Sequence, residues 1–464
     1  MKTGKVYIIG AGPGDPELIT LKGKKVLSQC DVVIYDSLVE KSILKYANKK
    51  AELICVDEIC EKQKETFIDK QDIINKTILI KVKEGKNLVR LKNGDPFIFG
   101  KAREEISFLE QNNIEYYIIP GITSANCASV YSGVPLTMRN ISSSVIFLTG
   151  HQIKNANNQI KWDIISKLET IVLYMASKNL KNIFEKLIEN GMDKKTPFVG
   201  IYNVSNIGQR IIEGEIGYIE NHLSELNAPL IVIIGNVVKE RFKWFEKRKK
   251  ILFFGLSPRR YFEDGIIFHL PLIEIKELED YSEFDNELKK INEYDWIIFT
   301  SRFGVIHFFK RLFHLSYDTR YIANLKIAAI GSSTGNKLKR YGIIPDIIPS
   351  KESSIGLIEE FKKIEIKYKK IFLPRSDISD KNLKIELEKM GCYVKSIPCY
   401  RNVIPENIPN IDFSLFDEII FTSPSTVRNF KKIFKKLPKI NIRCIGEITE
   451  KALKTEFYNE NEKI

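Results

Sequence analysis

The chain has few of the residues that build disulfide-linked or metal-centred proteins. Its 464 residues include 7 cysteines and 5 histidines. The cysteine count is odd, and even neighbours such as Cys55 and Cys60 are spaced too widely for the CxxC pair of a zinc or thioredoxin-like site. The histidines form neither an HExxH motif nor a pair four residues apart on a helix. We therefore expect reduced, mostly buried thiols and no metal site.

Long apolar runs are also missing. The opening sequence MKTGKVYIIGAGPGDP contains an apolar run too short for a signal peptide, and no later run reaches the roughly 18 residues of a membrane span. We therefore expect a cytoplasmic protein without a membrane partner. With 44% hydrophobic and 28% charged residues in 464 positions, the chain has a globular composition and is too long for one core, so we expect two or three domains.

A large share of the net charge of +13 lies in one short run. The net charge is about +3 over 1–240, about +5 over 241–250 and about +5 over the remainder. A nucleic-acid-binding arm is one interpretation of the basic run 241–250. A solvated linker between domains is favoured because the sequence pattern changes there. The diffuse positive charge elsewhere suits a polyanionic small substrate, and the near-neutral first half argues against RNA.

Short runs rich in valine and isoleucine alternate with helical stretches in the first half. The predicted strands are KVYIIG, DVVIYD, NLVRL, EYYIIP, SVIFLTG, TIVLYM, PFVGIY and PLIVIIG. This alternation indicates an α/β fold with a largely parallel sheet. Such sheets bind ligands at the carboxyl ends of their strands, so we expect the functional residues there.

The second half contains an internal repeat. DWIIFTSRFGVIHFF at 295–309 recurs as DEIIFTSPSTVRNF at 417–430, and KIAAIGSSTGNKLKRYGI at 326–343 recurs as IRCIGEITEKALKTEF at 442–457. Each repeat predicts two strands that each end just before a helix, which implies two similar α/β lobes with a cleft between them. A duplication without functional meaning would leave the same pattern. We expect the extended segments 267–275 and 393–402 to cross between the lobes.

A glycine-rich turn, GAGPGDP at 10–16, follows the first predicted strand. Asp15 is placed to cap the next helix, and Pro16 occupies its first position. The turn invites a dinucleotide-binding interpretation. However, Asp15 stands where the GxGxxG motif has its third glycine, and Pro13 lacks the N–H that could donate to a phosphate. Nicotinamide binding is therefore disfavoured.

Separated motifs in the first half follow the order found in the tetrapyrrole (corrin/porphyrin) methylases. They are GAGPGDPELITLKG at 10–23, VRLKNGDPFIFGKAREE at 89–105, PGITSANCASVYSGVPLTMR at 120–139, TGH at 149–151, VLYMASKNL at 172–180 and APLIVIIGNVV at 228–238. Residues 1–240 thus resemble a uroporphyrinogen-III C-methyltransferase. The resemblance implies a two-lobed class III methyltransferase fold that binds S-adenosylmethionine between its lobes, and a homodimer formed through this domain.

The resemblance also implies the cofactor contacts. On the family pattern, S-adenosylmethionine would lie against Pro13, Asn93, Gly94, Asp95, Ile98, Thr123, Ser124, Met175 and Val204. A glycine at Gly94 lets the backbone approach a ligand, and the Asp95 carboxylate can accept hydrogen bonds from the ribose or the amino group. Ile98 and Met175 can flank the adenine or the sulfonium, although an ordinary core role is the alternative for Met175.

Methyl transfer from a sulfonium needs chiefly alignment in a dry cleft, but the acceptor carbon must then lose a proton. Asp36 ends the strand DVVIYD and corresponds to the proton acceptor assigned in related enzymes; a helix N-cap is its alternative role. For the substrate's carboxylates the resemblance offers Lys101 and Arg139, with Glu104 at an acidic family position. Solvent-facing roles are the alternative for all three.

Several positions depart from the family pattern. Asn93 replaces the first glycine of GGD, Met138 replaces the histidine of LTHR, and Lys101 stands where arginine is expected. Lysine cannot form the bidentate hydrogen bonds that a guanidinium forms with a carboxylate. Glu58 stands in place of the family lysine, and Val204 in place of the glycine of an NGT-like turn. These departures bear on the catalytic assignments more than on the fold.

Residues 251–464 resemble uroporphyrinogen-III synthase in four stretches, IIFTSRFGV at 297–305, 327–361, 371–402 and IIFTSPSTVRNF at 419–430. The implied reaction closes a linear hydroxymethylbilane without a cofactor, so hydroxyls and helix N-termini matter more than strong acids. Candidate substrate contacts lie at strand-to-helix turns, where helix capping is the alternative: Thr300, Ser301, Ser332, Thr422 and Ser423. Tyr400 matches a family tyrosine proposed to assist loss of the hydroxyl. The long first helix and the last strand and helix of the family are missing.

The sequence therefore predicts a fusion with a methylase domain at 1–240, a basic linker at 241–250 and a pseudo-repeated α/β synthase domain at 251–464, with lobes at about 251–273 plus 402–464 and at 274–401. The expected activities are cyclisation of hydroxymethylbilane to uroporphyrinogen III and transfer of two methyl groups to it. The product, precorrin-2, would serve sirohaem or cobalamin synthesis. The alternatives are a non-catalytic tetrapyrrole-binding second half and another corrin-ring or ribosomal-RNA methyltransferase.

Overall fold

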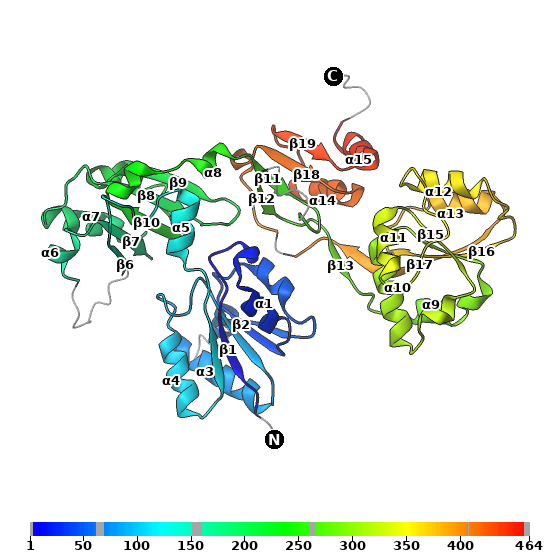
Figure 1. Cartoon of the computed structure of the whole chain (residues 1–464), viewed down its shortest axis with the longest axis horizontal. Helices are drawn as coiled ribbons and strands as arrows, with labels where there is room; N and C mark the ends of the chain where they lie inside the picture. Colours follow the sequence, from blue (N-terminus) through cyan, green and yellow to red (C-terminus); the bar gives the residue numbers. More distant parts are fainter. Residues whose placement is uncertain (1–2, 62–68, 151–159, 259–264, 407, 459–464) are drawn as a thin grey trace. The chain divides into compact units, whose positions relative to one another are not determined.

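The computed structural model describes residues 3–61, 69–150, 160–258, 265–406 and 408–458, and its elements are labelled in Figure 1. The chain forms two compact units, Met1–Lys250 with Ile411–Leu415 and Ile251–Asn410 with Phe416–Ile464. No helix within the described ranges has both the length and the apolar character needed to cross a membrane. All seven cysteines are free and five of them are buried.

The first lobe of unit 1 is a five-stranded parallel sheet in the order β3-β2-β4-β1-β5. Its elements are β1 (Val6–Gly10), η1 (Pro16–Leu18), α1 (Leu21–Leu27), β2 (Val32–Tyr35), η2 (Lys41–Tyr46), β3 (Glu52–Cys55), α2 (Val56–Glu61), α3 (Lys70–Lys83), β4 (Leu88–Lys92), α4 (Ala102–Gln111), β5 (Tyr116–Ile119) and α5 (Ser124–Ser132). The central strands β2 and β4 are buried on both faces. Continuous apolar runs are expected of such strands.

The second lobe of unit 1 has the strand order β6-β7-β10-β8-β9. Its elements are β6 (Val145–Thr149), α6 (Trp162–Ile165), β7 (Thr170–Tyr174), α7 (Leu180–Glu189), β8 (Pro197–Tyr202), β9 (Arg210–Glu215), η3 (Ile216–His222), β10 (Leu230–Ile234) and η4 (Asn236–Glu240). Only β6 and β7 are parallel, whereas β10 and β9 pair antiparallel with their neighbours. The prediction of a largely parallel sheet is therefore wrong for this lobe, because strands buried on both faces show the same apolar run in either direction.

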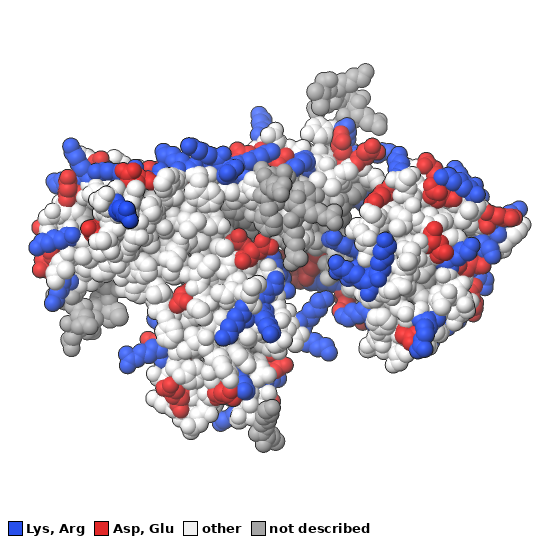
Figure 2. Space-filling model, viewed as in Figure 1, with Lys and Arg blue, Asp and Glu red and all other residues white. Residues whose placement is uncertain are grey.

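The basic run 241–250 differs in part from a solvated linker. The Arg241 side chain is 3% exposed and forms ion pairs with Glu213 and Glu246. The indole of Trp244 donates to the carbonyl of Val130 at 2.6 Å, in the short helix α8 (Trp244–Lys247). Lys and Arg side chains gather along the edge of unit 1 where α8 lies (Figure 2). The first residues of the run are therefore packed into unit 1, while the later charged residues Lys247, Arg248 and Lys249 are exposed.

Unit 2 holds two α/β lobes, with sheet orders β12-β11-β18-β19 and β13-β17-β16-β14-β15. The first lobe contains β11 (Lys250–Phe253), β12 (Ile266–His269), β18 (Glu418–Phe421), α14 (Pro424–Phe434), β19 (Asn441–Cys444) and α15 (Glu447–Phe457). The second contains β13 (Glu274–Lys276), α9 (Ser282–Lys289), β14 (Trp296–Phe299), α10 (Arg302–His314), β15 (Lys326–Ala329), α11 (Ser332–Lys339), α12 (Ser354–Phe361), β16 (Lys370–Ser376), α13 (Asn382–Lys389) and β17 (Tyr393–Val403).

The internal repeat corresponds to a repeated structure. In one lobe β14 leads into α10 and pairs in parallel with β15, and in the other β18 leads into α14 and pairs in parallel with β19. The segments expected to cross between lobes meet one another, because β13 pairs antiparallel with the end of β17. In the described residues α15 is the last element, so β19 forms an edge of its sheet.

Candidate active site

Three strands of the first lobe end in glycines that pack backbone against backbone. A Cβ atom on Gly10 would lie 2.6 Å from the Cα of Gly121 and 2.6 Å from the carbonyl oxygen of Gly94. A Cβ on Gly121 would lie 2.2 Å from that same oxygen. Gly12 and Gly94 also exchange backbone hydrogen bonds of 3.2 and 2.9 Å. Glycine is therefore required at the carboxyl edge of β1, β4 and β5, because these backbones approach more closely than a Cβ would allow, and parallel sheets bind their ligands at this edge.

The loop after β4 is held by the carboxylate of Asp95. Its Oδ1 accepts from the backbone N–H of Phe97 at 2.9 Å and its Oδ2 accepts from that of Gly121 at 3.0 Å. Asp95 therefore ties the loop to the end of β5, a role that its sequence position did not reveal. The Oδ1 atom of Asn93 in the same loop is buried and accepts no hydrogen bond from the described residues. An acceptor of this kind suits a ligand that brings its own N–H or O–H donor.

The predicted apolar and hydroxyl contacts gather around Tyr174, at the end of β7. Its hydroxyl lies 2.5 Å from Oγ1 of Thr123 and accepts from the backbone N–H of Ala125 at 3.2 Å, at the start of α5. Met175 follows with φ 51° and is 52% exposed. Phe99 has φ 53°, and its ring centroid lies 4.9 Å from that of Tyr174. Strained backbone of this kind is concentrated at ligand sites, and an exposed Met175 is not an ordinary core residue.

The remaining predicted cofactor residues lie in the same region of unit 1. Ser124 Oγ is the atom nearest to a Cβ placed on Gly94, at 3.5 Å, and Ile98 is half-buried against the core beside α5. The loop after β8 meets the glycine-rich turn, since Nδ2 of Asn206 donates to the carbonyl of Pro13 at 3.4 Å. Val204 in that loop is 6% exposed and packs into the core of the second lobe, so its side chain faces away from solvent.

Asp36, at the end of β2, is held by a buried network of charges. Nη2 of Arg90 donates to Oδ1 of Asp36 at 2.5 Å, and Nε of Arg90 donates to Oε1 of Glu105 at 3.0 Å. Nζ of Lys92 donates to the same Glu105 oxygen at 2.8 Å. Arg90, Lys92 and Glu105 are 2%, 4% and 1% exposed, whereas the Asp36 side chain is 31% exposed. Asp36 is therefore the solvent-facing end of this network.

The burial of this network makes the charge of Lys92 costly. Burial, followed by the charge of Arg90, lowers the pKa of Lys92 below its ordinary value. The sequence analysis missed Arg90, Lys92 and Glu105, and selected Glu104, which is exposed. The sequence did contain a signal for this network: Arg90 and Lys92 are charged residues at alternate positions of an otherwise apolar strand. Side chains at alternate positions lie on the same face of a strand, so both must enter the same buried layer.

The predicted substrate-binding residues of unit 1 are not brought together by contacts. Lys101, Glu104 and Arg139 are exposed and form no ion pair with the described residues. Lys101 has φ 54° at the N-cap of α4. Glu58 is exposed on α2. The last residue of the TGH motif, His151, lies outside the described residues.

A lysine absent from the sequence-based prediction does lie beside Asp36. Lys70, the first residue of α3, pairs with Oδ1 of Asp57. Oδ2 of Asp57 accepts from the backbone N–H of Ser37 at 3.3 Å. The hydrogen bond to Asp57 is the main cause that raises the pKa of Lys70, and the charge of Asp36 contributes. The residue after Asp36 is therefore tied to a lysine through one carboxylate.

In unit 2 the structure brings Tyr400 and Ser301 together. The Tyr400 hydroxyl lies 2.9 Å from Oγ of Ser301, which also accepts from the backbone N–H of Gly304 at 2.9 Å as the N-cap of α10. Tyr400 is 6% exposed and its ring stacks on that of His307. Burial raises the pKa of Tyr400, although the hydrogen bond with Ser301 opposes the rise. Thr300 is half-buried at the end of β14.

The other hydroxyl candidates of unit 2 serve helix ends. The backbone N–H of Ser332, at the start of α11, donates to Oε1 of Glu352 at 3.0 Å, so a carboxylate of the chain itself occupies that helix N-terminus. Ser423 caps α14 in a reciprocal pair with Thr426. Thr422 lies against Gly255, where a Cβ would come within 2.6 Å of it.

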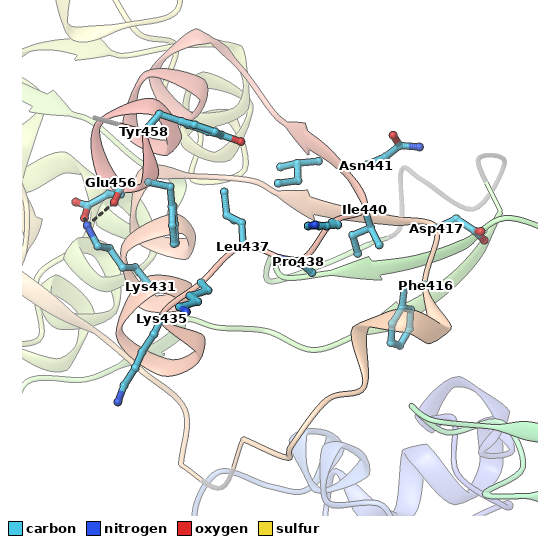
Figure 3. A pocket seen from close by; sticks show the side chains of 14 residues that line it. Phe416, Asp417, Lys431, Lys435, Leu437, Pro438, Ile440, Asn441, Glu456 and Tyr458 are labelled. Carbon is cyan, nitrogen blue, oxygen red and sulfur yellow. Dashed lines mark hydrogen bonds and ion pairs between the residues drawn. The ribbon is translucent and has the colours of Figure 1, made fainter. Parts of the chain in front are cut away.

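A hollow of about 1020 Å³ lies elsewhere in unit 2 and contains none of the predicted site residues. Figure 3 shows its lining, which comes from the start of β18, the ends of α14 and α15 and the segment between α14 and β19. Four lysines line it, namely Lys431, Lys435, Lys436 and Lys439. Lys431 is paired with Glu456 at 3.2 Å.

The fold and the sites define a two-lobed class III methyltransferase followed by a pseudo-repeated α/β unit. Residues 5–220 match the family described as Tetrapyrrole (Corrin/Porphyrin) Methylases, and residues 263–459 match Uroporphyrinogen-III synthase HemD. The chain therefore belongs to the tetrapyrrole methylase family and carries a HemD-type domain after the methylase. Both resemblances inferred from the sequence are confirmed, and the chain is a methyltransferase of tetrapyrrole biosynthesis.

The chain is also similar to individual proteins. The chain is 33% identical to the Porphyrin biosynthesis protein HemD of Ruminiclostridium josui, over 98% of this chain and 94% of that one. It is 45% identical to the Uroporphyrinogen-III C-methyltransferase of Methanocaldococcus jannaschii, over 51% of this chain and 97% of that one. A solved structure, uroporphyrin-III C-methyl transferase from Thermus thermophilus complexed with S-adenyl homocysteine, aligns with a TM-score of 0.43 and 28% identity over 51% of this chain and 94% of that one.

Proposed function

We propose that unit 1 transfers two methyl groups from S-adenosylmethionine to uroporphyrinogen III, giving precorrin-2, and that unit 2 makes uroporphyrinogen III from hydroxymethylbilane. The observation that carries the first activity is Asp36, a carboxylate at the carboxyl edge of a parallel sheet that is oriented by a buried guanidinium. Unit 2 would then supply the substrate of unit 1 within one chain.

The residues of unit 1 fit an S-adenosylmethionine site. Gly10, Gly94 and Gly121 pack together at the carboxyl edge of the first sheet, where sheets of this kind bind their ligands. The unsatisfied oxygen of Asn93 calls for a donor, and the strained, exposed Met175 offers an apolar surface. Bound there, S-adenosylmethionine supplies an electrophilic methyl group that needs no further activation.

The task of the protein is then to align the acceptor and remove its proton. Asp36 is placed to accept that proton, because its carboxylate is partly exposed while Arg90 fixes its orientation from behind. Lys70, tied to Ser37 through Asp57, adds positive charge next to the site, which suits a substrate rich in carboxylates. Exposed Lys101 and Arg139 remain candidates for the same role.

For unit 2, the pair of Ser301 and Tyr400 supports cyclisation of the bilane. A buried phenol with a raised pKa stays protonated at neutral pH and can donate a hydrogen bond to a departing hydroxyl. The N-terminus of α10 adds its partial positive charge at the same place.

The test uses the purified full chain and hydroxymethylbilane. Formation of the type III uroporphyrinogen isomer faster than spontaneous closure is expected, and addition of S-adenosylmethionine should then give precorrin-2. Type I product alone would contradict the synthase proposal and leave unit 2 a tetrapyrrole-binding module. Absence of methylated product from supplied uroporphyrinogen III would contradict the methyltransferase proposal, and methylation of a later corrinoid or of ribosomal RNA instead would assign another substrate.

A further inference from the structure

Arg375, at the end of β16, carries a buried charge without an ion pair. The residue is 7% exposed, and its one hydrogen bond within the described residues runs from Nη1 to the carbonyl of Asp380 at 2.6 Å. Its Nε is buried without a partner, and it lies within ion-pair distance of no described carboxylate. A buried guanidinium without an ion pair is destabilising, because it has lost its hydration. Such a charge is expected where an anion completes the site.

The surroundings of Arg375 show where that anion would be placed. The strand register between β16 and β17 shifts between Arg375 and Ser376, and Ser376 then lies opposite Tyr400. A Cβ on Gly304, in the first turn of α10, would lie 3.2 Å from the carbonyl oxygen of Pro374, so the start of α10 packs on the end of β16. Arg375 therefore ends its strand next to the Ser301–Tyr400 pair and the N-terminus of α10.

Electrostatics links Arg375 to the same place. Burial lowers the pKa of Arg375, and the charges of Asp380 and Tyr400 partly oppose this. The guanidinium in turn lowers the pKa of Tyr400 against the larger effect of burial. Asp377 is the nearest acidic neighbour along the strand, and its Oδ1 is engaged by the backbone N–H of Asn402 at 2.9 Å. The charge of Asp380 therefore offsets that of Arg375 only in part, and no described carboxylate forms an ion pair with it.

We infer that Arg375 binds a carboxylate of the tetrapyrrole substrate of unit 2 and holds it beside Ser301 and Tyr400. A guanidinium can grip a carboxylate with two parallel hydrogen bonds, which fixes orientation as well as charge. The helix N-terminus of α10 adds to the attraction. The inference rests on the proposed function of unit 2. It assigns a positively charged residue to substrate binding, whereas the other candidates of unit 2 are hydroxyl residues.

The test compares the full chain with Arg375→Gln, Arg375→Lys and the control Arg340→Gln, since Arg340 is an exposed arginine of the same lobe. Rates of type III uroporphyrinogen formation are measured over a range of hydroxymethylbilane concentrations. We expect Arg375→Gln to raise KM at least tenfold with kcat changed less than threefold, Arg375→Lys to lie between, and Arg340→Gln to match the parent chain. An unchanged KM in Arg375→Gln overturns the inference.

Two further measurements distinguish carboxylate binding by Arg375 from a structural role and from a failure of the synthase proposal. Because Arg375→Gln removes an uncompensated buried charge, its thermal unfolding midpoint should equal or exceed that of the parent chain; a lower midpoint with unchanged KM would show a structural role and overturn the inference. If the parent chain makes no type III isomer, the synthase proposal fails by itself. Binding of uroporphyrin, an octacarboxylate, then decides: weaker binding by Arg375→Gln than by Arg340→Gln supports the carboxylate site, and equal binding overturns it.

Discussion

Nη2 of Arg90 lies 2.5 Å from Oδ1 of Asp36, and it joins this partly exposed carboxylate, which follows β2, to a buried charge cluster. The arginine is 2% exposed and is held from its other side by Glu105. Because the guanidinium cannot turn away, the carboxylate is kept in one orientation at the carboxyl edge of β2. This relationship, more than Asp36 alone, distinguishes the position from an ordinary helix cap.

Replacement of Asp36 by asparagine should separate catalysis from binding. We expect the kcat for methyl transfer to fall by about 10²- to 10⁴-fold, the usual contribution of a general base, with S-adenosylmethionine affinity unchanged. Glu58→Gln serves as the control, since Glu58 is an exposed acidic residue on α2. Methylation of uroporphyrinogen III at the parent rate by Asp36→Asn would rule out the proton-acceptor role.

The buried cluster should behave as a coupled unit in unfolding experiments. Arg90→Met leaves Glu105 with Lys92 alone, and Glu105→Gln leaves Lys92 without a carboxylate and Arg90 with Asp36 alone. Each change is therefore expected to lower the free energy of unfolding by about 3–5 kcal/mol. The double variant should cost clearly less than the sum, which a double-mutant cycle in urea would measure. Strict additivity would mean that the two residues do not interact.

The pH dependence of the free energy of unfolding should reveal the lowered pKa of Lys92. Its pKa is lowered from 10.5 in the folded chain, chiefly by burial, so the unfolded state binds more protons between the lowered pKa and 10.5. Stability therefore rises with pH across that window, as the cost of the buried charge is relieved. We expect the stability difference between Lys92→Met and the parent chain to shift in favour of the parent as pH rises from about 7 to 10. A difference that is independent of pH would contradict the lowered pKa.

The glycines at the carboxyl ends of β1, β4 and β5 allow a test with a matched control. Gly121→Ala would place a Cβ 2.2 Å from the carbonyl oxygen of Gly94 and force apart the loops after β1, β4 and β5. S-adenosylmethionine binding, measured by calorimetry, should weaken at least tenfold. Gly191→Ala has φ +98° but open space around the new methyl group, so it reports the cost of backbone strain alone, about 1 kcal/mol, with binding retained. Equal effects of the two changes would argue against a ligand at these glycines.

Tyr400→Phe tests the second unit without altering its packing. The ring stays against His307 while the hydrogen bond with Ser301 is lost. We expect cyclisation of hydroxymethylbilane to slow at least tenfold and methylation of supplied uroporphyrinogen III to continue unchanged. A full rate of type III isomer formation would remove Tyr400 from the mechanism.

Part of the fold follows from local sequence. Valine- and isoleucine-rich runs mark the buried strands, and the glycine turn at Gly10–Gly14 marks the carboxyl end of the first. The repeat of DWIIFTS and DEIIFTS by itself indicates two lobes of similar structure. Strand direction does not follow, because an apolar run carries no information on whether its neighbour is parallel. The mostly antiparallel sheet in the second lobe of unit 1 was not predicted for that reason.

The sequence by itself determined the family, the two-part organisation and the segments that form the sites, since these depend on ordered motifs and local periodicity. Only the tertiary structure decided which charges meet. Arg90, Lys92 and Glu105 come together because two alternate positions of β4 and one face of α4 share a buried layer. Arg375 and Tyr400 become neighbours through a register shift between two strands. In the cluster of Arg90, the contacting residues lie 13 to 54 positions apart in the sequence. No local sequence pattern specifies which residues will meet across a sheet.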